Sequence, residues 1–374
     1  MSKSFEYTTL AHRYTARFPL ATYVGTQVNF WIIANILLVI ISHLVLQMVS
    51  QFYDITLAPL LGTMLWIAVI LGILCGLCLG LSGYYVEKNL LRRKSLGTRI
   101  VLKALISFSV LIAIIALLRH VFLAPLIYPS LGITQPLDEQ LWKSMFILLA
   151  VYYFVMSIII SFVNQINKKY GPGILLPLLL GRYRNPREEK RIFLFMDLKS
   201  STSTAEQLGH LKYSAFIRDC FLDINEVLYA FRAQVYQYVG DEIVVTWPEN
   251  EGIKDHCCIA FYAACKKQFE LRKEHYLGNY DLLPNFKAGA HTGTVSAVEI
   301  GEVKRDIAFH GDTLNTASRI QSVCNEYNKS FLVSKDLLDK VGVHSNMKVE
   351  ELGMVLLKGK TSKVGIYHVD WQVA

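Results

Sequence analysis

The chain has 374 residues, of which 53% are hydrophobic, and its formal net charge is +8. A mean hydropathy of +0.34 is high for a soluble protein and argues against a chain that is soluble along its whole length. Most apolar residues precede residue 165, and basic residues flank the apolar stretches there. Because basic residues beside membrane spans explain the positive charge, we expect no nucleic-acid partner.

Four apolar stretches in the N-terminal half predict four transmembrane helices in a lipid bilayer, at residues 28–49, 56–86, 100–118 and 144–167. The second stretch contains no charged residue and is long enough to cross a bilayer. Lys and Arg gather before the first span, between the second and third, and after the fourth, whereas residues 50–55 around Asp54 and residues 120–142 around Asp138 lack them. This asymmetry predicts a multi-pass protein of the cell (inner) membrane with both termini and the soluble half in the cytoplasm.

These features divide the chain into a cytoplasmic N-terminal segment (1–26), a membrane domain (27–167), a junction rich in Pro and Gly (168–190) and a soluble domain (191–374). Seven cysteines in membrane or cytoplasmic contexts argue against a disulfide framework. His43 and His120 fall in or beside predicted spans, where ionisable groups are functional candidates. Haem ligation, helix packing and interfacial placement all stay open for them.

The soluble half alternates strand-like and helix-like patterns, which indicates an α/β or α+β fold. In chain order we expect a strand (191–196), a helix (204–231), a hairpin (235–239 with 243–247), a helix (254–276), a strand pair (286–309), a helix (312–325) and a final strand (365–369). Gly240 and Asp241 lie at the turn of the hairpin.

Two aspartates are placed to bind metal. Asp197 ends the first strand and Asp241 lies in the hairpin turn, so the two carboxylates meet at one sheet edge if the hairpin pairs beside that strand. Mg²⁺ is commonly held by one or two carboxylates together with substrate phosphates, and two such ions can share phosphate oxygens. Residues 198–202 then turn into a helix, whose backbone N–H groups can bind phosphate. Taken singly, each Asp would equally suit a turn or a helix cap.

Three further polar residues suit a nucleotide. Asn315 and Arg319 are four residues apart on a predicted helix and therefore share one face. The Arg guanidinium matches phosphate oxygens, and the Asn amide can hold a ribose oxygen or a water. Lys360 follows Gly359 in a late turn and suits terminal phosphates. Each of the three alone would be read as a solvated surface residue.

Taken together, these segments resemble the catalytic domain of the class III nucleotidyl cyclases, over residues 190–370. The matching segments are FMDLKSST (195–202), YVGDE (238–242), HTG (291–293), GDTLNTASR (311–319) and LKGK (357–360). The resemblance implies an α+β, ferredoxin-like (palm-type) fold and a membrane-anchored adenylyl or guanylyl cyclase. It also implies a homodimer whose active sites lie between the two catalytic domains.

The resemblance further implies a role for each residue. Asp197 and Asp241, with the carbonyl of Leu198, would bind two Mg²⁺ or Mn²⁺ ions in each active site. Thr202 and Lys360 would contact the substrate phosphates, Arg319 would stabilise charge on the α-phosphoryl group, and Asn315 would position the ribose. The ribose 3′-OH would attack the α-phosphate of ATP, forming 3′,5′-cyclic AMP and releasing pyrophosphate.

The residues that read the purine depart from the family pattern, which has Lys with Asp or Thr for adenine and Glu with Cys or another small polar residue for guanine. The first position falls on Gln237 and the second on Ala308; a shift of two residues along the strand would place Asp306 there instead. Because no purine-reading Glu is present, we expect ATP, with GTP as the alternative.

Two other classes of protein compete with this interpretation. A diguanylate cyclase has a Gly-Gly-Asp-Glu-Phe hairpin, but Val239 stands at its first Gly and such an enzyme has no counterpart of GDTLNTASR. A catalytically degenerate, cyclase-like membrane sensor or binding module is the second alternative. The unusual base-reading positions favour it, and the presence of all the other site residues opposes it.

Overall fold

The structure is a computed structural model that describes residues 18–53, 61–89, 96–117, 138–170, 181–302, 305–358 and 362–372. It separates into two compact units, one formed by Phe18–Pro172 and the other containing Gly173–Ala374. Each unit is described by itself.

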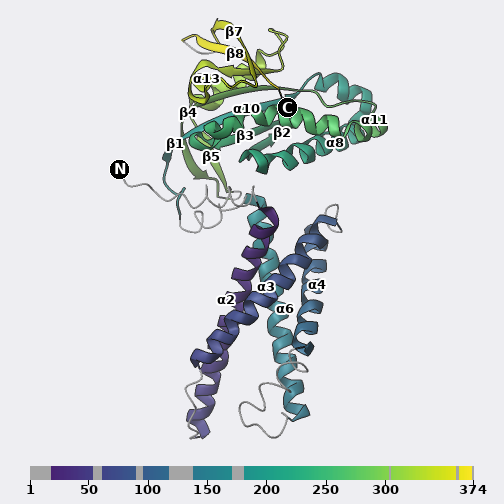
Figure 1. Ribbon diagram of the computed structural model, residues 1–374, viewed down its shortest axis with the longest axis vertical. Helices are drawn as coiled ribbons and strands as arrows, with labels where there is room; N and C mark the ends of the chain where they lie inside the picture. The colour runs from purple at the N-terminus through teal and green to yellow at the C-terminus, as the bar shows by residue number, and fades with distance from the viewer. Residues whose placement is uncertain are drawn as a thin grey trace. The chain divides into compact units, whose positions relative to one another are not determined.

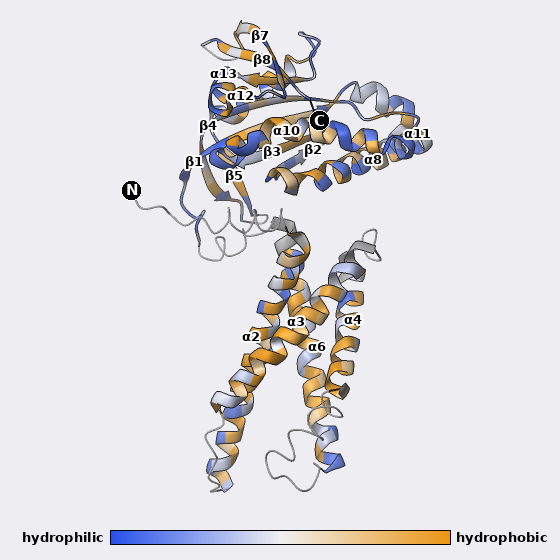
Figure 2. Cartoon of the chain, viewed as in Figure 1, coloured by the Kyte–Doolittle hydropathy of each residue, from blue (hydrophilic) through white to orange (hydrophobic). Residues whose placement is uncertain are grey.

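The first unit consists of long apolar helices (Figures 1 and 2): α2 (Pro19–Tyr53), α3 (Leu61–Asn89), α4 (Leu96–Leu117) and α6 (Glu139–Tyr170). Three have the length and apolar composition needed to cross a membrane, over Leu20–Tyr53, Leu61–Val86 and Glu139–Ile166. The apolar run of α4, Val101–Ala116, is shorter than these. The structure therefore supports three of the four predicted spans by length and composition.

Glycines bring α2 and α3 into direct backbone contact. A Cβ added at Gly76 would lie 2.4 Å from the Cα of Val28, and one at Gly72 would lie 2.5 Å from the Cα of Ile32. Small residues at helix interfaces permit this close packing in membranes, where apolar burial provides no driving force. Between α2 and α6, the Tyr153 hydroxyl donates to Asn35 Oδ1 at 2.7 Å.

The second unit is built on one mixed, eight-stranded sheet. Seven strands follow the order β2-β3-β1-β4-β6-β8-β7, and β5 pairs with β4 off this path. Only the β4–β6 pair is parallel among the described strands. The strands are β1 (Arg187–Leu198), β2 (Gln234–Val239), β3 (Glu242–Pro248), β4 (Phe286–Ile300), β5 (Asp306–His310), β6 (Phe331–Ser334), β7 (Met347–Val355) and β8 (Val364–Trp371).

The helices of this unit are α8 (Ser201–Leu228), α9 (Glu249–Ile253), α10 (Cys257–Leu271), α11 (Lys273–Tyr280), α12 (Asp312–Ser322) and α13 (Lys335–Val341). Alternate residues of β1 separate the two faces of the sheet. Ile192, Leu194 and Met196 join the large core under α8 and α10, and Phe193 and Phe195 join a smaller cluster with Ala317 of α12. The α8 and α10 helices therefore cover one face (Figure 1), and α12 lies on the other.

The strands and helices expected at residues 191–325 are present, and the last strand lies within β8. The first helix begins three residues earlier than expected, and the second divides into α10 and α11. Sequence reasoning assigned no element to β6, α13 or β7. It also placed Arg187–Lys190 in the junction, whereas these residues form the start of β1 and pair with β4.

Candidate active site

A row of three charged residues crosses the sheet where β1 ends. Asp197 is paired with Glu242 of β3 on one side and with Lys287 of β4 on the other. Directly opposite residues of antiparallel strands project from the same face. Asp197 belongs to the same alternating set as Phe193 and Phe195, so the row lies on the face that α12 covers.

Asp241 lies beside this row because β2 and β3 are joined by a tight two-residue turn. Gly240 has φ +62°, a conformation that glycine adopts without a steric penalty. The prediction that Asp197 and Asp241 meet at one sheet edge holds, because β3 pairs with β1 and its first residue, Glu242, lies opposite Asp197. The Asp241 Oδ2 atom is buried and has no hydrogen-bond partner in the described part of the chain.

Two neighbours hold the Asp197 carboxylate. The Gln321 side chain of α12 donates from Nε2 to Asp197 Oδ2 at 3.1 Å, and Lys287 Nζ lies 3.3 Å from the same oxygen. Burial and then the Asp241 carboxylate raise the pKa of Asp197 above its ordinary value, although Lys287 and Gln321 oppose the shift. The two aspartates are therefore close enough to repel one another when both are ionised.

These features fit a divalent cation. Two carboxylates that repel one another, one with an unpartnered buried oxygen, are stabilised by positive charge between them. No three His, Cys, Asp or Glu residues are arranged to hold a metal ion within the described ranges. Such a two-carboxylate site suits Mg²⁺ or Mn²⁺ that receives its remaining ligands from backbone, water and substrate phosphates.

The chain turns sharply between β1 and α8, beside the carboxylates. The side chain of Leu198 is buried, and Ser200 adopts a left-handed conformation with φ 55°. No side chain caps the N-terminus of α8, and Thr202 is exposed in its first turn. Backbone N–H groups without intrahelical partners at such a terminus suit a phosphate, so phosphate binding here stays a prediction.

The α12 helix carries Asn315 and Arg319 on the side away from the sheet. Asn315 is exposed and Arg319 half-buried, whereas Thr313, Ala317 and Gln321 face inward. A Cβ at Gly289 would lie 2.2 Å from the Gln321 nitrogen, so α12 packs directly on β4. Within the described residues, no hydrogen bond or ion pair joins Asn315 or Arg319 to Asp197 or Asp241. One chain thus brings the aspartates together without the Asn and Arg.

The base-reading candidates lie on two strands. Gln237 is exposed on β2, just after a shift in the β2–β3 register between Val235 and Gln237. On β5, Ala308 is buried and Asp306 is exposed, and Asp306 Oδ1 accepts a bond from the Ile307 backbone N–H. The β4–β5 register runs without a shift from Asp306 to His310.

Two predicted residues, Lys360 and His120, lie outside the described residues, and His43 lies on α2. Sequence reasoning missed Lys287, Gln321 and Glu242 as neighbours of the aspartates. The adjacency of Glu242 to Asp241 was the available signal, since a carboxylate beside a candidate ligand adds charge to the same site.

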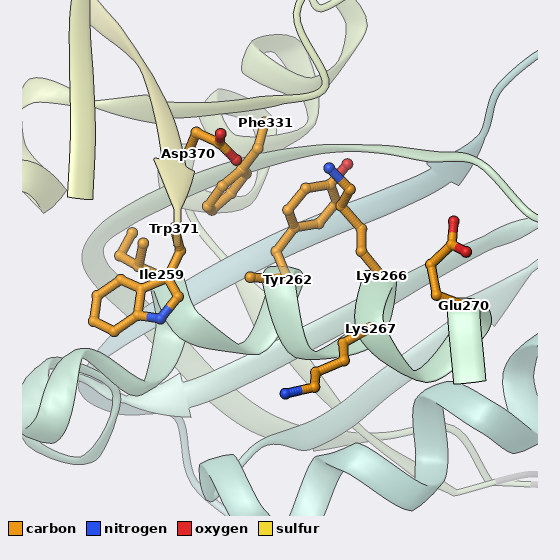
Figure 3. Close-up of a pocket in the computed structure, with 9 residues that line it drawn as sticks. Ile259, Tyr262, Lys266, Lys267, Glu270, Phe331, Asp370 and Trp371 are labelled. Carbon is orange, nitrogen blue, oxygen red and sulfur yellow. The ribbon is translucent and has the colours of Figure 1, made fainter. Parts of the chain in front are cut away.

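A separate pocket of about 340 Å³ lies between α10 and strands β6 and β8 (Figure 3). Tyr262 and Lys266 of α10, Phe331 of β6 and Trp371 of β8 line it. None of the predicted site residues does, so this pocket is distinct from the carboxylate site.

Comparisons with known proteins identify the family of the second unit. A family model described as the adenylate and guanylate cyclase catalytic domain matches residues 184–370. The chain is 34% identical over 216 residues to adenylate cyclase 2 of Rhizobium meliloti (strain 1021), covering 58% of this chain and 60% of that protein. It is 26% identical over 181 residues to adenylate cyclase 1 of the same organism, covering 47% of this chain and 27% of that protein.

Among solved structures, the adenylyl cyclase CyaB from P. aeruginosa aligns with 50% of this chain and 97% of its own, at 16% identity and a TM-score of 0.45. The chain spans 60% or less of the length of the two Rhizobium relatives. The family model nevertheless covers half of the chain, including both aspartates and the helix with Asn315 and Arg319. The chain therefore belongs to the family defined by the adenylate and guanylate cyclase catalytic domain.

Proposed function

We propose that this protein is a membrane-bound adenylyl cyclase that converts ATP to 3′,5′-cyclic AMP and pyrophosphate. The observation that carries the proposal is the pair Asp197 and Asp241: a buried carboxylate oxygen of Asp241 has no partner among the described residues, and burial and then the Asp241 carboxylate raise the pKa of Asp197. Family membership and the relatives named adenylate cyclase support the choice of reaction.

In this proposal Asp197, Asp241 and the Leu198 carbonyl would hold two Mg²⁺ or Mn²⁺ ions. Such ions favour loss of the proton from an attacking hydroxyl and neutralise phosphate charge. The ribose 3′-oxygen forms a bond to the α-phosphorus while the bond from that phosphorus to the pyrophosphate oxygen breaks. The hydroxyl proton leaves to solvent, so the atoms of ATP are divided between the cyclic nucleotide and pyrophosphate.

The residues of the chain position the substrate and stabilise charge. Asn315 orients the ribose, and the Arg319 guanidinium stabilises the charge that develops on the α-phosphoryl group. The uncapped N-terminus of α8, with Thr202, and Lys360 bind the remaining phosphates. Because no hydrogen bond or ion pair joins Asn315 or Arg319 to the aspartates of their own chain in the described residues, they serve the site of a second copy, in a homodimer.

We further propose that the enzyme is anchored in a membrane. The apolar helices form a four-span anchor in the inner membrane, with both termini and the catalytic domain in the cytoplasm. The catalytic domain has a ferredoxin-like, palm-type fold. The three helices that meet the length and composition of a membrane span support the anchor.

The test is nucleotide turnover by the full-length protein in lipid nanodiscs with Mn²⁺. We expect cyclic AMP and pyrophosphate in equal amounts from ATP, and a loss of about a hundredfold or more in Asp197→Asn or Asp241→Asn, because each change removes a metal ligand. Unfolding midpoints of both variants should match the wild type, which excludes misfolding as the cause. If either variant keeps more than about a tenth of the wild-type rate, the assignment of these ligands is wrong.

A further inference from the structure

Glu242 is a third carboxylate at the metal site. It directly follows Asp241 in the chain and lies opposite Asp197 in the β1–β3 register. Directly opposite residues of antiparallel strands have Cβ atoms about 5 Å apart and share a face. The sheet therefore fixes Glu242 on the same side as Asp197, within one residue of Asp241.

The one positive charge in this row of residues, that of Lys287, is paired with Asp197 and not with Glu242. Lys287 Nζ is 3.3 Å from Asp197 Oδ2, on the side of β1 away from Glu242. Glu242 itself is half-buried and has no hydrogen-bond or ion-pair partner among the residues that the structure describes. Three carboxylates beside one lysine leave a net excess of two negative charges when all are ionised. One divalent cation would neutralise this excess.

Burial makes this excess costly. A half-buried carboxylate without a partner loses solvation that it does not regain inside the protein. A divalent cation bound beside the row would offset this loss.

The geometry also limits what Glu242 can do. Since no three acidic residues are arranged to hold one ion within the described ranges, Glu242 is not a third direct ligand beside both aspartates. A carboxylate beside the two direct ligands can still bind the ion through one of its water molecules, and such water-mediated bonds are nearly as favourable as direct ones.

We propose that Glu242 is a positioning residue of the metal site, which binds a water ligand of the divalent ion and so increases the affinity of the site for metal. The inference rests on the proposed function, because it assumes the metal site at Asp197 and Asp241. Partners in this outer position change metal affinity by about 10- to 100-fold in other metal proteins.

The experiment measures metal affinity directly, without turnover. The full-length protein in nanodiscs is titrated with Mn²⁺ in the absence of nucleotide, and free Mn²⁺ is followed by electron paramagnetic resonance. Glu242→Gln keeps the size of the side chain and removes its charge, and we expect its Kd for Mn²⁺ to rise by about tenfold or more. Glu242→Ala gives a second variant with the same expectation.

The matched control is Glu249→Gln, just beyond the opposite end of β3. Glu249 pairs with Lys340 and accepts a bond from the Thr292 hydroxyl, away from the aspartates. Glu249→Gln should leave the Kd for Mn²⁺ within about twofold of the wild type, because the Glu249–Lys340 pair lies beyond the other end of β3 from the aspartates.

Asp241→Asn separates failure of this inference from failure of the proposed function. If Asp241→Asn loses Mn²⁺ binding and both Glu242 variants keep the wild-type Kd, Glu242 has no role at the metal and the inference is overturned, while the proposed function stands. If Asp241→Asn and Asp197→Asn also keep the wild-type Kd, the metal site and both proposals fall.

Discussion

The three candidate base-reading residues have different surroundings. Gln237 is exposed on β2, and Asp306 and Ala308 are two residues apart on the same face of β5. Because the β4–β5 register is unbroken, β5 contains no bulge that would bring Asp306 to the position of Ala308. A Gln amide can donate to or accept from either purine, so nothing described on these strands strongly rejects GTP.

We therefore predict modest discrimination between ATP and GTP in the wild type. Gln237→Lys should increase the ratio of kcat/KM for ATP to that for GTP if Asp306 completes the adenine-reading pair, because a polar pair rejects the wrong base more strongly than one amide. Adding Asp306→Ala to this variant should erase the gain. The measurement is kcat/KM for both nucleotides with Mn²⁺, and identical ratios in all the proteins would show that neither residue reads the base.

The sequence predicted the candidate site residues but not the side chains that contact Asp197. Asp197, Asp241, Asn315 and Arg319 stand in contiguous motifs, so a single sequence is enough to select them. Lys287 and Gln321 reach Asp197 from other elements, β4 and α12. Their contacts depend on the register of β4 against β1 and on the close approach of α12 at Gly289, and neither is encoded in local spacing.

Helices α8 and α11 are joined by a buried polar network. Asp219 of α8 accepts bonds from the Tyr280 hydroxyl at 2.8 Å and from His275 Nε2 at 2.9 Å. Burial alone would raise the pKa of Asp219, but hydrogen bonds from His275, Tyr280 and Arg218 outweigh it and lower the pKa below 3.8. The same network fixes the part of α8 that follows its kink at Gly209.

This lowered pKa predicts a pH-dependent contribution to folding. Asp219 binds a proton more readily in the unfolded chain, so its stabilising effect is present above the ordinary pKa of 3.8 and is lost as pH falls through the lower folded value. Asp219→Asn should lower the free energy of unfolding by about 1–3 kcal/mol at pH 7. The difference from the wild type should shrink at about pH 3, because Asp219 is then increasingly protonated.

Urea unfolding of the full-length protein at the two pH values checks this prediction. Asp255→Asn is the control, because Asp255 forms an exposed pair with Arg232 that contributes little to stability. An Asp219→Asn deficit of the same size at both pH values would show that the carboxylate acts only through packing.

The close packing of α2 on α3 predicts that a larger residue at their contact destabilises the helical unit. Gly76→Ala would place a Cβ 2.4 Å from the Val28 Cα, so the two backbones must separate. We expect a loss of about 1–3 kcal/mol in the stability of the helical unit. Gly62→Ala in the same helix is the matched control, since nothing lies within 4 Å of its added Cβ.

Steric trapping or denaturation in mixed micelles measures the difference between these two variants. Gly62→Ala should equal or slightly exceed the wild type, because Ala is the better helix former. Equal stability of Gly76→Ala and Gly62→Ala would mean that α2 and α3 are not held at the distance seen here.

Elements with strong periodicity were predictable from the sequence, and short ones were not. The apolar lengths of α2, α3 and α6 and the Gly-Asp turn between β2 and β3 are local signals. β6 has only four residues, all of them buried. It pairs with β4, although the α12 helix separates the two strands along the chain. Its apolar run is too short to separate from a loop or helix segment until its partners are known.

At the scale of the whole molecule, the candidate site residues fall into two separate groups. The aspartates meet at the edge of β1 and β3, whereas Asn315 and Arg319 lie on the outer side of α12. Gln321 of this same helix bonds to Asp197 of its own chain. In the proposed function, one chain would present one half of each of two sites, and a two-fold dimer would complete both, since two-fold interfaces exchange the same surface.

Complementation between two inactive variants tests this arrangement. Asp197→Ala lacks a metal ligand and Arg319→Ala lacks the guanidinium, so each homodimer should be inactive. In a heterodimer, one site contains both lesions and the other contains every group. Random pairing makes half of the dimers heterodimers with one intact site of two, so co-expression should restore about a quarter of wild-type activity. Two differently tagged Asp197→Ala chains provide the control and should restore none. If the tagged Asp197→Ala and Arg319→Ala chains co-purify and the mixture is still inactive, the groups act within one chain and the shared site is wrong.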